Sequence, residues 1–171
     1  MPKLTSDEAK AFLDEPGILM RIGVVEASGA PLVTPIWFLH DSGEILFTPR
    51  EKSVWFAALR REPRISLCID EDALPYRKVL IAGVARLVHD VGNDDVWRHQ
   101  YHAMATKYVG ERGATKYLED TIDQPRGLYS VSLSEAKVTS WRMPVAGEPG
   151  MGRTGSSSPQ GGERSPRWVD P

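Results

Sequence analysis

Hydroxyl and cationic side chains gather in one short run of the chain, Leu-Phe-Thr-Pro-Arg-Glu-Lys-Ser, at residues 46–53. Thr48 ends a predicted strand, Arg50 and Lys52 lie in a polar loop, and Ser53 stands where a N-cap would begin the next helix. Cations, hydroxyls and the free N–H groups of a helix start are the groups that bind a phosphate. The run therefore predicts a phosphate site, and a solvated turn with a helix cap is the alternative interpretation.

A proline interrupts the preceding strand, in the run Val33, Thr34, Pro35, Ile36 and Trp37. Because proline has no backbone N–H to donate, a strand that contains it lies at a sheet edge or a bulge. An unpaired edge beside a hydroxyl can hydrogen-bond the polar rim of a planar heterocycle. A protected edge strand without a ligand is the other interpretation.

Tryptophans are the candidates for the wall of a ring pocket: Trp37, Trp55, Trp97 and Trp141. Trp97 recurs at helical spacing with other apolar residues, so it is expected in the core. His99 and His102 lie three apart on a predicted helix, but two ligands without a third predict a surface pair, and no metal site is expected.

The usual catalytic signatures are missing from the sequence. Cys68 alternates with apolar neighbours on a predicted strand, which indicates a packed thiol rather than a nucleophile. No Walker loop, G-x-S-x-G or G-x-G-x-x-G pattern occurs. The catalytic residues therefore remain unassigned at this stage.

Short strands and helices must position these groups. Strands are predicted over residues 18–27, 32–39, 44–48, 64–70, 79–88, 128–133 and 137–141, the first three as an antiparallel meander. Helices are predicted after the Thr5/Glu8 capping box, over 54–61, and from Asn93, with a break at Gly110 and a second short helix over 114–121. Mainly hairpin connections predict a mainly β fold with short helices, a small closed or split β-barrel with a bend at Gly83.

The whole chain has 171 residues, a formal net charge of -2, 41% hydrophobic residues and one cysteine. No basic excess indicates nucleic acid, and no apolar run is long enough to span a membrane. The polar start has no secretory signal, so a cytoplasmic protein is expected. Residues 1–143 are expected to form one cofactor-binding domain and residues 144–171 a disordered tail rich in Gly, Pro, Ser and Arg.

Several stretches match one family in their order along the chain. They are residues 29–38, 46–48, 59–67, 75–77, 108–111 and 123–126, with Trp141-Arg142 at the closing strand. With these stretches, residues 4–143 resemble the pyridoxamine 5′-phosphate oxidase-like split-barrel family. Its members bind FMN or the related 8-hydroxy-5-deazaflavin coenzyme.

The resemblance implies a place for each part of the cofactor. The isoalloxazine ring would lie against Val33 to Trp37, and the phosphate would lie in the loop from Thr48 to Ser53. Trp55 stands where the family has a lysine, and Lys52 would replace it. Trp141 and Arg142 would complete the pocket.

The resemblance also implies an FMN-dependent oxidoreductase that acts on a small-molecule substrate, as a homodimer with the cofactor at the interface. A deazaflavin-dependent reductase is one alternative, in which a basic groove would take the acidic coenzyme tail; the candidates for it are Arg50, Lys52, Arg60, Arg61 and Arg64. A non-catalytic flavin-binding or stress-related module is the other.

Overall fold

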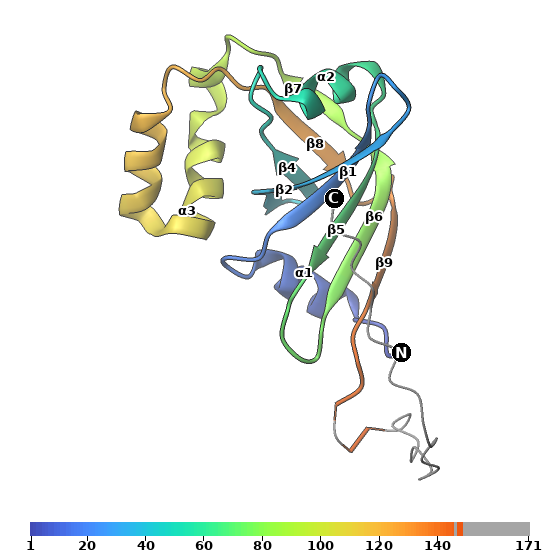
Figure 1. Ribbon diagram of the computed structural model, residues 1–171. Helices are drawn as coiled ribbons and strands as arrows, with labels where there is room; N and C mark the ends of the chain where they lie inside the picture. Colours follow the sequence, from blue (N-terminus) through green and yellow to red (C-terminus); the bar gives the residue numbers. More distant parts are fainter. Residues whose placement is uncertain (146, 149–171) are drawn as a thin grey trace, which may run out of the picture.

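Two antiparallel sheets form the body of the protein in the computed structural model, which describes residues 1–145 and 147–148 (Figure 1). The five-stranded sheet has the order β2 (Pro31–Ile36), β1 (Met20–Val25), β5 (Arg64–Asp70), β6 (Lys78–Val84), β9 (Lys137–Trp141). The four-stranded sheet has the order β3 (Leu39–Asp41), β4 (Glu44–Phe47), β8 (Leu128–Ser132), β7 (Arg86–His89). This architecture confirms the predicted mainly β, split-barrel fold.

The predicted three-stranded meander is wrong, because the chain changes sheets after β2. β2 pairs only with β1, and β3 and β4 form a second hairpin in the other sheet. The crossing is at Trp37 and Phe38, where Phe38 is fully buried and its N–H donates to the Tyr108 hydroxyl rather than to a strand. Pro35 lies on this edge strand, as expected.

The long strand predicted over residues 79–88 is also divided between the sheets, into β6 and β7. Gly83 lies just before the division, and a Cβ there would meet the Ala136 Cβ at 3.1 Å and a Val131 methyl at 3.2 Å. The absence of a side chain therefore allows the close approach at which the strand leaves its sheet, which is where a bend was predicted.

The core lies between the two sheets. Alternate residues of β5, namely Ile65, Leu67 and Ile69, are buried, as the sequence pattern predicts. Helix α1 (Ser6–Asp14) begins at the predicted capping box, and α2 covers the predicted Val54–Arg61. α1 adds the fully buried Phe12 to this core.

Helix α3 (Asp94–Asp120) is two arms joined by a corner at Gly110, where a break was predicted. The glycine has φ 70° and ψ 170°, a conformation that is essentially restricted to glycine. The arms lie side by side beside the sheets (Figure 1). The second arm begins directly after Gly110, earlier than predicted. The first arm buries Trp97, Tyr101, Met104 and Ala105 in a second cluster.

Residues 144–171 were expected to be disordered. The structure describes only residues 144–145 and 147–148 of this segment. There Glu148 pairs with Arg142, Nη2 to Oε1 at 2.6 Å. Among the residues that the structure describes, no helix has the length and apolarity to cross a membrane.

Candidate functional site

A groove of about 390 Å³ opens where the end of β2, the loop after β4, the start of α2 and both arms of α3 meet. Most of the residues singled out in the sequence line it together. The lining consists of Leu19, Pro35, Ile36, Trp37, Thr48, Arg50, Ser53, Trp55, Tyr101, Tyr117 and Arg126. Two runs that are separate in the sequence, 33–37 and 48–53, therefore contribute to the same groove.

Trp37 forms a flat aromatic wall of this groove. Its ring stacks on Tyr108, with centroids 5.0 Å apart and planes 4° apart, and Tyr117 lies against it at 4.9 Å. The Tyr108 hydroxyl accepts from the N–H of Phe38 at 3.1 Å and donates to the carbonyl of Ile18 at 2.9 Å. The wall is thus fixed by backbone hydrogen bonds, and its shape suits a planar ring.

The other end of the groove is cationic. Arg50 Nη2 donates to the Tyr117 hydroxyl at 3.3 Å, and Arg126 Nη2 donates to the same oxygen at 3.4 Å. Arg126 is only 6% exposed, its Nη1 donates to the Thr48 carbonyl at 3.4 Å, and its guanidinium lies over the Tyr101 ring.

Most of the other arginines in the described part of the chain form ion pairs with carboxylates, but Arg50 and Arg126 do not. Arg21, Arg60, Arg64, Arg77, Arg86, Arg98 and Arg142 all form ion pairs. Within the described residues, neither Arg50 nor Arg126 forms one. Two guanidiniums without a direct ion pair leave this end of the groove positively charged, which suits an anion.

Tyr117 is the polar centre of this end. Burial raises the pKa of its phenol, but hydrogen bonding at the hydroxyl and the charges of Arg50 and Arg126 outweigh burial, so the pKa lies below its ordinary value. The oxygen accepts from both guanidiniums, so Tyr117 joins Arg50 and Arg126 at this end of the groove.

Ser53 stands at the N-cap position of α2 but does not cap the helix with its side chain. Ser53 is therefore the predicted N-cap residue, but its hydroxyl donates to the Arg50 carbonyl at 2.7 Å. The hydroxyl holds the loop that carries Arg50, and the first-turn N–H groups of α2 receive no side-chain cap. These groups lie beside the groove and remain suited to an anion.

Four of the predicted site residues do not line this groove. Val33 and Thr34 lie earlier on β2, and Val33 is 64% exposed on the outer face. Lys52 is exposed in the loop, and Trp141 lies on β9 at the opposite edge of the five-stranded sheet, with Lys78 at 5.6 Å from its ring.

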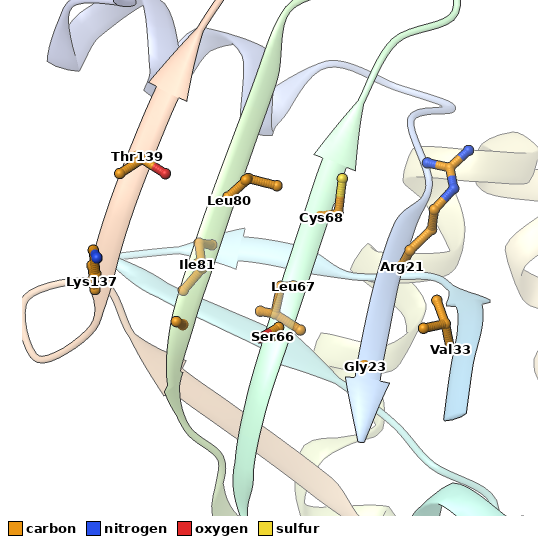
Figure 2. Close-up of a pocket in the computed structure, with 11 residues that line it drawn as sticks. Arg21, Gly23, Val33, Ser66, Leu67, Cys68, Leu80, Ile81, Lys137 and Thr139 are labelled. Atoms are coloured by element: carbon orange, nitrogen blue, oxygen red, sulfur yellow. The ribbon is translucent and has the colours of Figure 1, made fainter. Parts of the chain in front are cut away.

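The outer face of the five-stranded sheet carries a shallow, mainly apolar hollow of about 390 Å³. Figure 2 shows Cys68 and Leu80 along its floor, with Val33 at one side and Lys137 at the other. Cys68 is half-buried there, and burial raises the pKa of its thiol.

The arginines that were expected to extend the basic groove have other partners. Arg60 pairs with Asp90, Arg61 donates to the carbonyl of Val25, and Arg64 pairs with Glu62. None of the three lines the groove.

The two histidines do not form a metal site. His102 lies near Thr115 and Glu111, and no cluster of three metal-ligating side chains occurs in the residues described.

Sequence reasoning missed Tyr101, Tyr117 and Arg126 as site residues. Tyr101 shows only helical spacing with Trp97, and Arg126 lies in one of the matching stretches without a signal of its own. The available signal was the break at Gly110, because it folds the two arms together and brings both tyrosines to one side.

Comparison with known proteins gives a family. Residues 5–141 match the family model described as pyridoxamine 5′-phosphate oxidase. No relative was found among the curated proteins.

Solved structures share the fold. A conserved hypothetical protein from Mycobacterium tuberculosis, Rv2991, has 22% identity and a TM-score of 0.68, covering 91% of this chain and 95% of that one. An F420 reductase has 18% identity and a TM-score of 0.52, covering 75% and 94%. HutZ, the heme storage protein from Vibrio cholerae, has 18% identity and a TM-score of 0.60, covering 81% and 96%. At these identities the similarity shows the fold alone.

Proposed function

We propose, from the premise that this chain belongs to the pyridoxamine 5′-phosphate oxidase family, that it is an oxidoreductase that holds FMN in the groove. The observation that carries the proposal is the pairing of a flat aromatic wall, Trp37 on Tyr108, with two arginines that form no ion pair within the described residues. FMN has two matching parts, a planar ring that can lie against the aromatic wall and a phosphate that the arginines can bind.

Different groove residues would bind the ring and the phosphate of FMN. Trp37 and the edge of β2 beside Pro35 and Ile36 would lie against the ring. Arg50, Arg126 and the start of α2 would bind the phosphate. Bound FMN supplies the hydride or electron chemistry, and the chain orients the ring and excludes water.

A homodimer is part of the proposal, because Trp141 and the groove lie at opposite edges of the five-stranded sheet. Trp141 would therefore contribute to the groove of a second copy. The hollow on the outer face of the sheet between them is mainly apolar, and the exposed Val33 lies at its side. Such a face is typical of an interface. Sedimentation that shows a monomer at micromolar concentration with cofactor bound would contradict this arrangement.

Two alternatives use the same groove. A deazaflavin coenzyme is favoured by the two unpaired arginines, since its acidic tail also needs cations, and one structure with this fold is an F420 reductase. A module that binds flavin without catalysis differs only in turnover. Haem, which HutZ stores, would find no histidine, cysteine or methionine among the groove-lining residues described.

The test is a titration of the purified full chain with FMN, riboflavin, the deazaflavin coenzyme and haem, beside mass spectrometry of any co-purified small molecule. FMN should bind at least about tenfold more tightly than riboflavin, which lacks the phosphate. A charge-assisted hydrogen bond contributes about 1.5–3 kcal/mol. Arg50→Gln should therefore weaken FMN roughly tenfold to a hundredfold and leave riboflavin unchanged.

Arg112→Gln is the matched control, because Arg112 is exposed on α3 away from the groove. Lys52→Gln tests the sequence prediction that Lys52 holds the phosphate, and a loss equal to that of Arg50→Gln would show that the loop closes over the anion. Equal, weak binding of FMN and riboflavin would overturn the phosphate assignment. Reduction of the bound cofactor by a donor, followed by turnover, separates an enzyme from a binding module.

A further inference from the structure

A small pocket lies behind the groove, between α3 and the segment that follows it. Asp94, Trp97 and Tyr101 line it from the first arm of α3, and Gln124 and Arg126 line it from the segment before β8. The volume open to the centre of a water molecule is about 20 Å³. Tyr101 and Arg126 are shared with the groove, so the two spaces lie on either side of the same side chains.

Buried polar atoms without a hydrogen-bond partner gather around this space. In the part of the chain that is described, six such side-chain atoms occur, and all but Trp141 Nε1 belong to the lining. They are Asp94 Oδ1, Trp97 Nε1, Tyr101 Oη, Gln124 Oε1 and Arg126 Nε. Trp97, Tyr101 and Arg126 are only 1%, 7% and 6% exposed. Buried polar groups are nearly always satisfied, so their concentration here points to a ligand.

The mixture of donors and acceptors identifies the class of ligand. Trp97 Nε1 and Arg126 Nε can only donate, Asp94 Oδ1 and Gln124 Oε1 can only accept, and the Tyr101 hydroxyl can do either. An anion would meet the Asp94 carboxylate, and a cation would meet the Arg126 guanidinium. An organic molecule is too large for the space. A water molecule donates twice and accepts twice, and a polar cavity of this size can hold one.

We propose that this cavity binds an internal water molecule that links the carboxylate of Asp94 to the guanidinium of Arg126. The water donates to Asp94 Oδ1 and Gln124 Oε1 and accepts from Arg126 Nε and Trp97 Nε1 or the Tyr101 hydroxyl. Asp94 Oδ2 already accepts from the backbone N–H of Arg126 at 3.3 Å. The two charged side chains form no direct ion pair in the described structure, and the water completes their connection.

The water would hold the Arg126 guanidinium at Nε, on the side away from the groove. Arg126 directs Nη1 to the Thr48 carbonyl and Nη2 to Tyr117, both at the groove, while its Nε faces the cavity. Fixing Nε therefore fixes the plane of the guanidinium and the direction of its Nη donors. Asp94 and Gln124 become positioning residues for the groove, although neither lines it.

The first test is independent of any cofactor. A crystal structure of the cofactor-free full chain at better than about 1.8 Å should show an ordered water in hydrogen-bond contact with Asp94 Oδ1 and Arg126 Nε. Tyr101→Phe removes one hydroxyl and keeps the ring under Arg126. If the hydroxyl binds the water, this variant should melt about 2–4 °C lower than the wild type. An empty cavity or an ion in place of water would overturn the proposal. A melting temperature of Tyr101→Phe equal to or above that of the wild type would show that Trp97 Nε1 is the second donor to the water.

The second test rests on the proposed function. Gln124→Met removes an acceptor of the water without touching the groove, and it should weaken FMN several-fold while riboflavin binding stays the same. Gln100→Met is the matched control, because Gln100 is half-buried on α3 and lines neither space. An equal loss for FMN and riboflavin would refute the positioning role. If the wild type binds neither compound, the crystallographic and melting results still decide the water site, and only the proposed function fails.

Discussion

Removing the Tyr108 hydroxyl should destabilise the fold at the point where the chain changes sheets. In Tyr108→Phe the N–H of Phe38 loses its acceptor at 3.1 Å, and the carbonyl of Ile18 loses its donor at 2.9 Å. Leaving buried polar groups unpaired costs about 1–3 kcal/mol. For a chain of this size, roughly 2 kcal/mol lowers the melting temperature by about 4–8 °C.

Differential scanning calorimetry of the cofactor-free protein measures the effect, with Tyr76→Phe as the control. The Tyr76 side chain is exposed, so its variant should melt within about 1 °C of the wild type. Because Tyr108 also stacks on Trp37, Tyr108→Phe should loosen the aromatic wall and weaken FMN and riboflavin to the same extent. A Tyr108→Phe protein that melts like the wild type would show that the two hydrogen bonds do not hold this crossing.

Three further variants test other parts of the structure. Burial lowers the pKa of Lys107 to about 8, so the unfolded chain binds more protons between about pH 8 and the ordinary value of 10.5. Wild type should therefore gain stability relative to Lys107→Met as the pH rises from 7 to 10 in urea titrations, and a constant difference would contradict the shift. Arg77→Met should cost about 1.5–3 kcal/mol at pH 7, since Arg77 donates to Glu71 and Glu15. The Arg77 hydrogen bond lowers the pKa of Glu71, so this cost should shrink as the pH falls below about 4.5, and a pH-independent cost would refute the ion pair. Gly110→Ala should lose about 1–3 kcal/mol in the same titrations, because alanine is strained at φ 70°, and full stability would mean that the corner can change its conformation.

Local patterns were sufficient to predict most of the elements. The capping box at Thr5 begins α1, the alternation of Ile65, Leu67 and Ile69 gives β5, and Gly110 breaks α3. Each of these signals depends on residues that are close in the sequence. The sheet to which a strand belongs depends instead on long-range pairing. The sequence therefore could not show that β3 and β4 leave the sheet of β2.

For the same reason, the sequence could predict only part of the candidate site. The run from Thr48 to Ser53 and the proline strand carry local signals, and both contribute to the groove. Arg126 carries none, because its role depends on burial beside Tyr117 and on the absence of a carboxylate, and both are tertiary properties. Lys52 has the right charge and the right loop, but the direction of a side chain cannot be taken from its place in the sequence.

The place of β8 in its sheet has a consequence for synthesis on the ribosome. β8 lies between β4 and β7, and β9 completes the other sheet at β6. A nascent chain that ends before Leu128 has neither strand, so β4 and β7 remain unjoined and β6 keeps a free edge. Open strand edges are templates for pairing with other chains. The domain can therefore complete both sheets only after residues 128–141 have left the exit tunnel, and until then these strand edges are open to pairing with other chains.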